Sequence, residues 1–255
     1  MNFDITHILE RWDYEPGQVM VRRFTGKDGM EKIQLRLDLG LLQMNATGRP
    51  DGKRPSGHPT LHEYFQKKLS QHLEKHDGSD EGFTLDAEDC AKLQLEAIQF
   101  HHRYICLLQL NDFEGVVADT TRNLAVFDFV GKYAENDELA WSLQQFRPQL
   151  LMIHTRARAT NWLQSDAIEK ALQEIATGIE HLTEFYHKHN RPELPEQSAE
   201  IQSLQQWAEE LRAKRPLSER EKLELALLEA VKNEDYEEAA RLRDTLKKFP
   251  DHKTP

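Results

Sequence analysis

The chain has 255 residues, a length that suits one large domain or one domain with appendages. It carries 33 Lys and Arg against 44 Asp and Glu, a net charge of −11, which disfavours broad nucleic-acid binding because phosphate affinity comes mainly from clustered basic side chains. No apolar run is long enough to span a bilayer and no secretory leader is visible, so membrane and export classes are excluded and a cytoplasmic location is expected.

Two cysteines indicate a reduced protein. Cys90 and Cys106 both lie within apolar helical patterns, which favours small buried thiols over a disulfide. Two cysteines are also too few for a multi-cysteine zinc ribbon, so an intracellular chain without that kind of metal site is expected.

Residues 1–60 differ from the rest in charge and in pattern, and we predict that they form a separate unit. They have a net charge of +1, whereas the other 195 residues carry −12. Residues 18–24 and 31–38 alternate apolar and polar side chains around a Lys27-Asp28-Gly29 turn, which predicts a β-hairpin with one wet side. Residues 39–44 then run apolar into a loop that is dense in Gly and Pro.

That loop, residues 48–57, is a candidate second interaction surface or anion site. Arg49, Lys53 and Arg54 flank backbone amides that Gly52 and Gly57 leave free. The alternative is a purely structural connector between the hairpin and the first long helix.

Residues 61–190 are predicted to form a helical body. Thr60 and Glu63 fit a capping box, and helices are expected to reach about 75, then to cover about 86–110, 113–130, 137–146, 148–163 and 166–187, the last opened by Asp166 and Glu169. The turns near 111 and 165 both join the apolar end of one helix to an amphipathic restart, so the region resembles tetratricopeptide-like repeats. An irregular helical bundle would bury the same residues.

Residues 196–255 are predicted to form a third unit, because Pro192 and Pro195 interrupt the preceding helix. A linker helix comes first and ends at Pro216. Residues 217–249 then read as two helices joined by a turn at 233–235. The supporting signals are a capping box at 218–221, the apolar stripe Leu223, Leu227 and Val231 with Leu225 and Leu228 alongside, a second cap at Asp235, and a seam of Ala239, Leu242, Leu246 and Phe249.

Residues 228–244, Leu-Glu-Ala-Val-Lys-Asn-Glu-Asp-Tyr-Glu-Glu-Ala-Ala-Arg-Leu-Arg-Asp, resemble the UVR motif of UvrB and UvrC. The resemblance implies an antiparallel helical hairpin for protein–protein contact, with no catalytic role. Such segments join UvrB to UvrC in excision repair and also occur in a Clp-type unfoldase and in the adaptor of a protein-arginine kinase. The Gly17–Arg23 start and the Gly48–Gly52 loop resemble an uncharacterised bacterial family of UvrB/UvrC motif-containing proteins, which implies no activity.

Two helices of this length bury too little surface to be stable alone, so one face of the hairpin is expected to meet a partner protein or a second copy. Leu242 and Leu246 should face Leu227 and Val231. The predicted partner-binding residues are the small pair and the polar rim of the second helix: Tyr236, Glu237, Ala239, Ala240, Arg241 and Arg243. The alternative is that the hairpin folds back on residues 196–214.

The chain is therefore predicted to be an α+β, mainly α, non-catalytic adaptor without cofactor or metal. It lacks a Gly-x-x-x-x-Gly-Lys-Ser/Thr loop, and no catalytic set can be assigned. His58 and His62, and His72 and His76, are four residues apart, but no general-base Glu follows His72, so solvated histidines are the expectation. One of His101 and His102 should be a hydrogen-bonded core residue. The alternatives are an excision-repair accessory protein that binds UvrB or UvrC, and an enzyme of unknown type.

Overall fold

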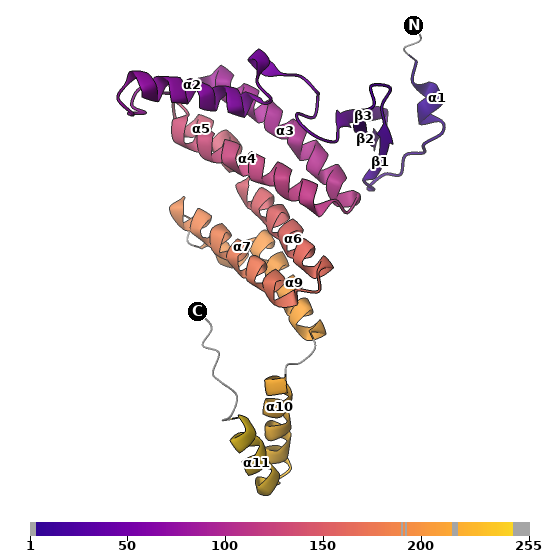
Figure 1. The fold of residues 1–255 in the computed structure, drawn as a ribbon, viewed down its shortest axis with the longest axis vertical. Helices are drawn as coiled ribbons and strands as arrows, with labels where there is room; N and C mark the ends of the chain where they lie inside the picture. The colour runs from indigo at the N-terminus through magenta and orange to yellow at the C-terminus, as the bar shows by residue number, and fades with distance from the viewer. Residues whose placement is uncertain (1–3, 190, 192, 216–218, 247–255) are drawn as a thin grey trace. The chain divides into compact units, whose positions relative to one another are not determined.

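The computed structural model describes residues 4–189, 191, 193–215 and 219–246. Contacts divide the chain into two compact units, residues 1–208 and 209–255. The fold class is α+β and mainly α, as predicted (Figure 1). The finer division into residues 1–60, 61–190 and 196–255 stays a prediction.

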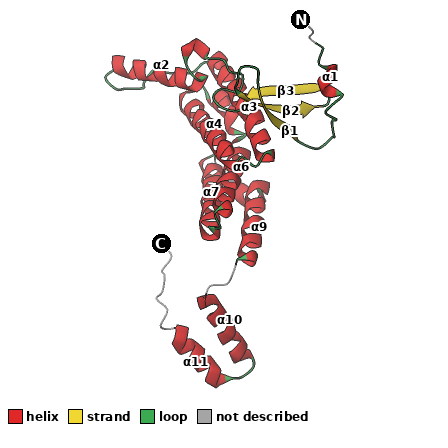
Figure 2. Cartoon of the chain, turned by 45° about the vertical axis from the view of Figure 1, so that its right-hand side comes forward, coloured by secondary structure: helices red, strands yellow, loops and turns green. Residues whose placement is uncertain are grey.

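The N-terminal strands form a three-stranded antiparallel sheet in the order β1-β2-β3 (Figure 2). A short helix α1 (Thr6–Leu9) precedes β1 (Met20–Thr25), β2 (Glu31–Leu37) and β3 (Gly40–Asn45). The first two strands are the predicted hairpin. The apolar run after it, which was not assigned to a strand, turns back at Asp38 and Leu39 and pairs with β2, so that Leu37 lies opposite Gly40 and Ile33 opposite Met44.

The two faces of the sheet differ in character. Ile33 and Met44 on one face are buried in the same apolar core as helices α2 to α6. On the other face, the Arg22 Nε donates to Gln34 and the Gln34 side-chain amide donates to Gln43, both at 2.8 Å. This polar ladder runs across all three strands, and the Trp12 ring lies 4.2 Å from the Arg22 guanidinium. The face that carries Ile33 and Met44 therefore anchors the sheet to the helical body.

The rest of the first unit is helical, and its helices follow the predicted spans closely. Their N-caps explain the agreement, since Thr60, Asp86, Asp112 and Asn136 each accept a backbone N–H at the start of a helix. The elements are η1 (Pro55–Gly57), α2 (Leu61–Lys75), α3 (Ala87–Gln109), α4 (Phe113–Tyr133), α5 (Asp137–Gln144), α6 (Arg147–Gln164), α7 (Ile168–Lys188), α8 (Leu194–Gln197) and α9 (Ala199–Lys214).

Helices α3 and α4, α4 and α6, and α6 and α7 pack against each other in succession. The second unit contains α10 (Glu219–Lys232) and α11 (Tyr236–Leu246), which pack together as the predicted hairpin. Among the described residues, no helix is both long enough and apolar enough to cross a membrane.

Three helix-to-helix turns of the chain share one backbone geometry. Asn111, Asp166 and Glu234 adopt left-handed conformations with φ of 56°, 53° and 58°. At each turn, this residue donates its N–H to the carbonyl three residues back, and the next residue donates to the carbonyl five residues back, at 2.9–3.1 Å. This is the Schellman pattern of a helix C-terminus. The residue that completes it also occupies the N-cap position of the next helix.

This geometry corrects one sequence assignment. Asp166 was predicted to open α7, but it occupies the left-handed position of the turn, and the N-cap is Ala167, which makes no side-chain cap bond. The resemblance of the body to tetratricopeptide-like repeats stays a prediction.

Candidate protein-interaction site

The C-terminal hairpin begins its second helix at the predicted cap. The Asp235 carboxylate accepts the Glu238 N–H at 3.1 Å, which satisfies one of the amides that have no partner at a helix start. The predicted first cap, at Ser218, lies outside the described residues, as does Phe249 at the end of the predicted seam.

The inner face of the hairpin is built from small and half-buried side chains. Ala230 on α10 is 9% exposed and Ala239 on α11 is 7% exposed. Leu227, Leu242 and Leu246 are partly buried. The seam therefore brings the two helices together at alanines, with leucines beside them.

The prediction that Val231 faces α11 is wrong, because its side chain is 51% exposed. The stripe that turns toward α11 steps through residues 223, 227 and 230. Ala230 takes the inward place, and at about 100° per residue Val231 is turned away from it.

The hairpin also exposes a set of large apolar side chains. The sequence interpretation placed three of them, Leu225, Leu228 and Val231, in or beside the seam, and the fourth, Tyr236, on the side that meets a partner. We call them the exposed apolar set: Leu225, Leu228, Val231 and Tyr236, which are 52%, 67%, 51% and 69% exposed. The first three recur every third residue along α10. The signal was present in the sequence, since five large apolar side chains between 223 and 231 are too many for one helical stripe.

The predicted partner-binding residues of α11 fall on both sides of the helix. Tyr236, Glu237, Arg241 and Arg243 are exposed, and Ala240 is partly buried. Arg241 lies 3.3 Å from Glu238, and Arg243 lies 3.1 Å from Asp244. Ala239 is buried inside the hairpin, where it allows the close approach of α10. The role of this set in partner binding stays a prediction.

Residues 218–249 match the family model of the UvrB/uvrC motif. The chain therefore contains a UVR motif, as the residues at 228–244 indicated. This motif is associated with protein interaction and with DNA repair, and it is not catalytic. No curated protein and no solved structure matches the chain.

The second predicted surface, the 48–57 loop, is tied to the helical body through Arg49. The Arg49 Nε donates to Glu96 at 2.7 Å, and its terminal nitrogen donates to Asp51 at 2.7 Å. Its guanidinium is thus engaged inside the protein. Lys53 and Arg54 are exposed, and Arg54 bonds the Gly57 carbonyl. Whether these three residues form an anion or interaction surface stays a prediction.

Glu96 is the buried centre of this connection. Its fully buried carboxylate also accepts the Leu61 N–H at 2.8 Å and pairs with Arg122. It therefore helps to cap α2 while joining the loop to α4. Burial lowers the pKa of Arg122 to about 10, so that its guanidinium still carries a charge at neutral pH. A Glu on the apolar face of α3, between Leu93 and Ala97, was the available sequence signal.

A second buried ion pair holds the end of the sheet. The Arg103 guanidinium donates to both carboxylate oxygens of Asp119, at 2.8 and 2.6 Å. Its other nitrogen donates to the carbonyls of Asn45 and Gly48, at 3.2 and 2.6 Å. Because a bidentate pair fixes both position and orientation, Arg103 aligns the end of β3 and the start of the loop on α3 and α4.

Several of the histidines pack or hydrogen-bond within the protein. His62 is buried, so the expectation that it is solvated is wrong, and burial lowers its pKa to about 4. The His72 and His76 rings stack 4.0 Å apart. His101 bonds the Tyr104 hydroxyl at 2.6 Å, but both it and His102 are only partly buried, so the expected hydrogen bond is present without a core position. In the part of the chain that the structure describes, no three His, Cys, Asp or Glu residues are placed to hold a metal ion.

Both thiols are free and buried, as predicted. Burial raises the pKa of Cys90 and of Cys106 to about 11, which makes both poor nucleophiles near neutral pH.

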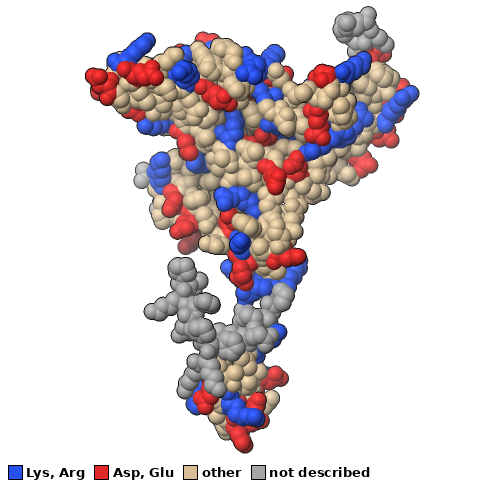
Figure 3. Space-filling view, in the orientation of Figure 1, with Lys and Arg blue, Asp and Glu red and all other residues tan. Residues whose placement is uncertain are grey.

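On the face of the molecule shown in Figure 3, basic and acidic side chains are interspersed.

Proposed function

We propose that this protein is a cytoplasmic adaptor without catalytic activity, which docks a protein partner through its UVR hairpin. The observation that carries the proposal is the exposed apolar set: a small helical unit, distinct in its contacts from residues 1–208, leaves four large apolar side chains at its surface. Apolar side chains grouped on an exposed face mark interaction sites in soluble proteins.

The energetics support a docking role. Fully burying a Leu or Val side chain contributes about 1.5–3 kcal/mol, so covering side chains that are half exposed yields roughly 1 kcal/mol each. Tyr236 and the nearby arginines add residue types that are common at binding hot spots. A partner that covers this set gains several kcal/mol, whereas in the free hairpin the same area faces water.

The helical body is then the scaffold that carries the docking unit, and a tetratricopeptide-like body would suit that role. The partner classes consistent with a UVR motif are UvrB or UvrC, a Clp-type unfoldase and a kinase adaptor system. Self-association through the same face is a further form of the proposal. An excision-repair accessory protein is the second candidate, favoured by the UvrB/uvrC motif itself.

The test uses the full chain and two variants that change the charge of α10 equally. Leu228→Glu places a charge in the exposed apolar set, and Lys232→Gln makes the same change of one unit at an exposed polar position outside that set. Proteins captured by the tagged wild type are identified and purified, and their dissociation constants are then measured against all three chains.

We expect Leu228→Glu to weaken binding by tenfold or more, which corresponds to about 1.4 kcal/mol, and Lys232→Gln to bind like the wild type. A purified UvrB or UvrC that binds in this way would favour the repair function, and an unfoldase or kinase component would favour quality control. Equal binding by Leu228→Glu and the wild type would contradict docking through this face.

A further inference from the structure

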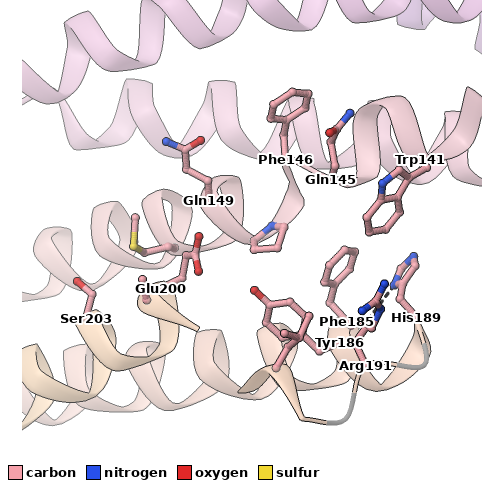
Figure 4. A pocket seen from close by; sticks show the side chains of 14 residues that line it. Trp141, Gln145, Phe146, Gln149, Phe185, Tyr186, His189, Arg191, Glu200 and Ser203 are labelled. Atoms are coloured by element: carbon pink, nitrogen blue, oxygen red, sulfur yellow. Dashed lines mark hydrogen bonds between the residues drawn. The ribbon is translucent and has the colours of Figure 1, made fainter. Parts of the chain in front are cut away.

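The first unit contains a cavity that the UVR hairpin does not explain. It has a volume of about 710 Å³ and lies among α5, the start of α6, the end of α7, α8 and the start of α9 (Figure 4). This volume falls within the range of sites that hold small organic molecules, about 300–1,000 Å³. Its apolar lining includes Trp141, Phe146, Met152 and Phe185.

One end of the cavity is an aromatic wall. The Trp141 and Phe185 rings are nearly parallel, with 11° between their planes and 6.4 Å between their centres. His189 lies 4.3 Å from Phe185, and its Nδ1 bonds the Phe185 carbonyl at 2.8 Å, which fixes the orientation of the imidazole. Phe185 is buried, whereas Trp141 is 46% exposed. The wall is thus rigidly backed and still offers ring surface to a ligand.

The two ends of the cavity differ in charge. Figure 4 shows Arg191 at the end that holds Trp141 and His189, and Glu200 at the other end. Among the described residues, the structure gives the Arg191 guanidinium no hydrogen-bond or ion-pair partner. Glu200, by contrast, accepts a hydrogen bond from Ser198 at 2.9 Å. An unpaired cation beside exposed aromatic surface is complementary to a molecule that joins a flat ring to an anionic group.

We propose that this cavity binds a small aromatic anion, with its ring on Trp141 and its anionic group on Arg191. Aromatic rings gain from offset stacking beyond the area that they bury, and Arg pairs with a carboxylate through charge-assisted hydrogen bonds. Glu200 sets the orientation, because its negative charge repels the anionic group from the opposite end. The site is independent of the UVR hairpin and does not rest on the adaptor function.

The experiment uses the full chain and the fluorescent aromatic anion 8-anilinonaphthalene-1-sulfonate as the probe. Its emission is titrated against wild type, Trp141→Ala, Trp141→Phe, Arg191→Gln and Arg191→Lys. Arg11→Gln is the matched control, since Arg11 is exposed and does not line the cavity. We expect Trp141→Ala and Arg191→Gln each to raise the dissociation constant by about tenfold, while Trp141→Phe, Arg191→Lys and Arg11→Gln change it by less than about threefold.

A competition experiment distinguishes the contribution of the ligand's anionic group to binding from that of its aromatic ring. Bound probe is displaced with 2-naphthoate or with the uncharged 2-naphthamide, and the naphthoate should compete about tenfold better on wild type but no better on Arg191→Gln. Near-ultraviolet circular dichroism shows whether each variant is folded. If Trp141→Ala is not folded, the test of the proposal rests on Trp141→Phe and Arg191→Gln. No probe binding by the wild type, equal binding by Arg191→Gln, or equal competition by the two naphthalenes would overturn the proposal.

Discussion

The turn of the UVR hairpin holds Glu234 in a conformation that suits glycine, and we predict that Glu234→Gly stabilises the hairpin. Glu234 has a φ of 58°, and its side chain is exposed. The left-handed region costs a residue with a Cβ about 1–2 kcal/mol, because Cβ crowds the following carbonyl. Glycine is the residue that helix C-termini most often place there.

The size of the effect follows from two opposing contributions. Removing the Cβ recovers about 1–2 kcal/mol, while the greater freedom of glycine in the unfolded chain costs about 0.5–1 kcal/mol. The midpoints of these two ranges give an expected net gain of about 0.5–1 kcal/mol. The Schellman bonds of the turn, 3.1 Å from the Glu234 N–H and 2.9 Å from the Asp235 N–H, involve backbone atoms only and survive the substitution.

Hydrogen exchange of the α10 and α11 amides in the full chain measures this change locally. A gain of 0.5–1 kcal/mol corresponds to a two- to fivefold increase in protection, at about 1.4 kcal/mol per factor of ten. Glu229→Gly is the control, because glycine in the interior of a helix costs about 1 kcal/mol and should lower protection. If Glu229→Gly lowers protection as expected and Glu234→Gly does not raise it, the left-handed turn is not what limits the stability of the hairpin.

Three further predictions concern the first unit. Burial lowers the pKa of His62 and of His154 to about 4, so the unfolded chain takes up protons near pH 6.5 that the native chain takes up only near pH 4. Urea titrations should therefore show the free energy of unfolding falling by about 1–3 kcal/mol per histidine as the pH is lowered from 6.5 to 4. The fall should be less steep in His154→Gln. Glu96→Gln leaves two arginines without their buried counter-charge and should lower the free energy of unfolding by about 3–5 kcal/mol in the same assay. A loss below about 1 kcal/mol would mean that these ion pairs contribute little to stability. A Cβ at position 178 would overlap the Thr155 side chain, so Gly178→Ala should destabilise the α6–α7 contact by about 1–3 kcal/mol, and adding Thr155→Ala should recover part of the loss.

The helices were predictable because their boundaries are local. An Asp, Asn or Thr side chain accepts an N–H two or three residues further on, so the information that starts α3, α4 and α11 lies within four residues at Asp86, Asp112 and Asp235. The left-handed turns were harder to assign. Asn111, Asp166 and Glu234 stand where a glycine is usual, and only the backbone reveals that the three turns share one left-handed geometry.

What the sequence could not give are contacts between distant residues. Glu96 and Arg49 are 47 residues apart, so neither the anchoring of the loop nor the capping of α2 by a residue of α3 follows from any local pattern. The third strand was missed for a related reason: an apolar run of six residues fits a strand or a buried helical segment equally well until its pairing with β2 is known.

The distribution of apolar side chains in the hairpin bears most directly on function. Its inner seam is centred on Ala230 and Ala239, which let the helices approach but bury little area, whereas Leu228 and Tyr236 are more than half exposed. A hairpin selected only for its own stability would turn its larger side chains inward, because each buried methylene contributes about 0.8 kcal/mol. Alanines at the centre of the seam, only partly buried leucines beside them and large apolar side chains left at the surface instead suit a unit whose core is completed by a partner. Binding and stability of such a unit are coupled, because a partner that binds only the folded hairpin stabilises it.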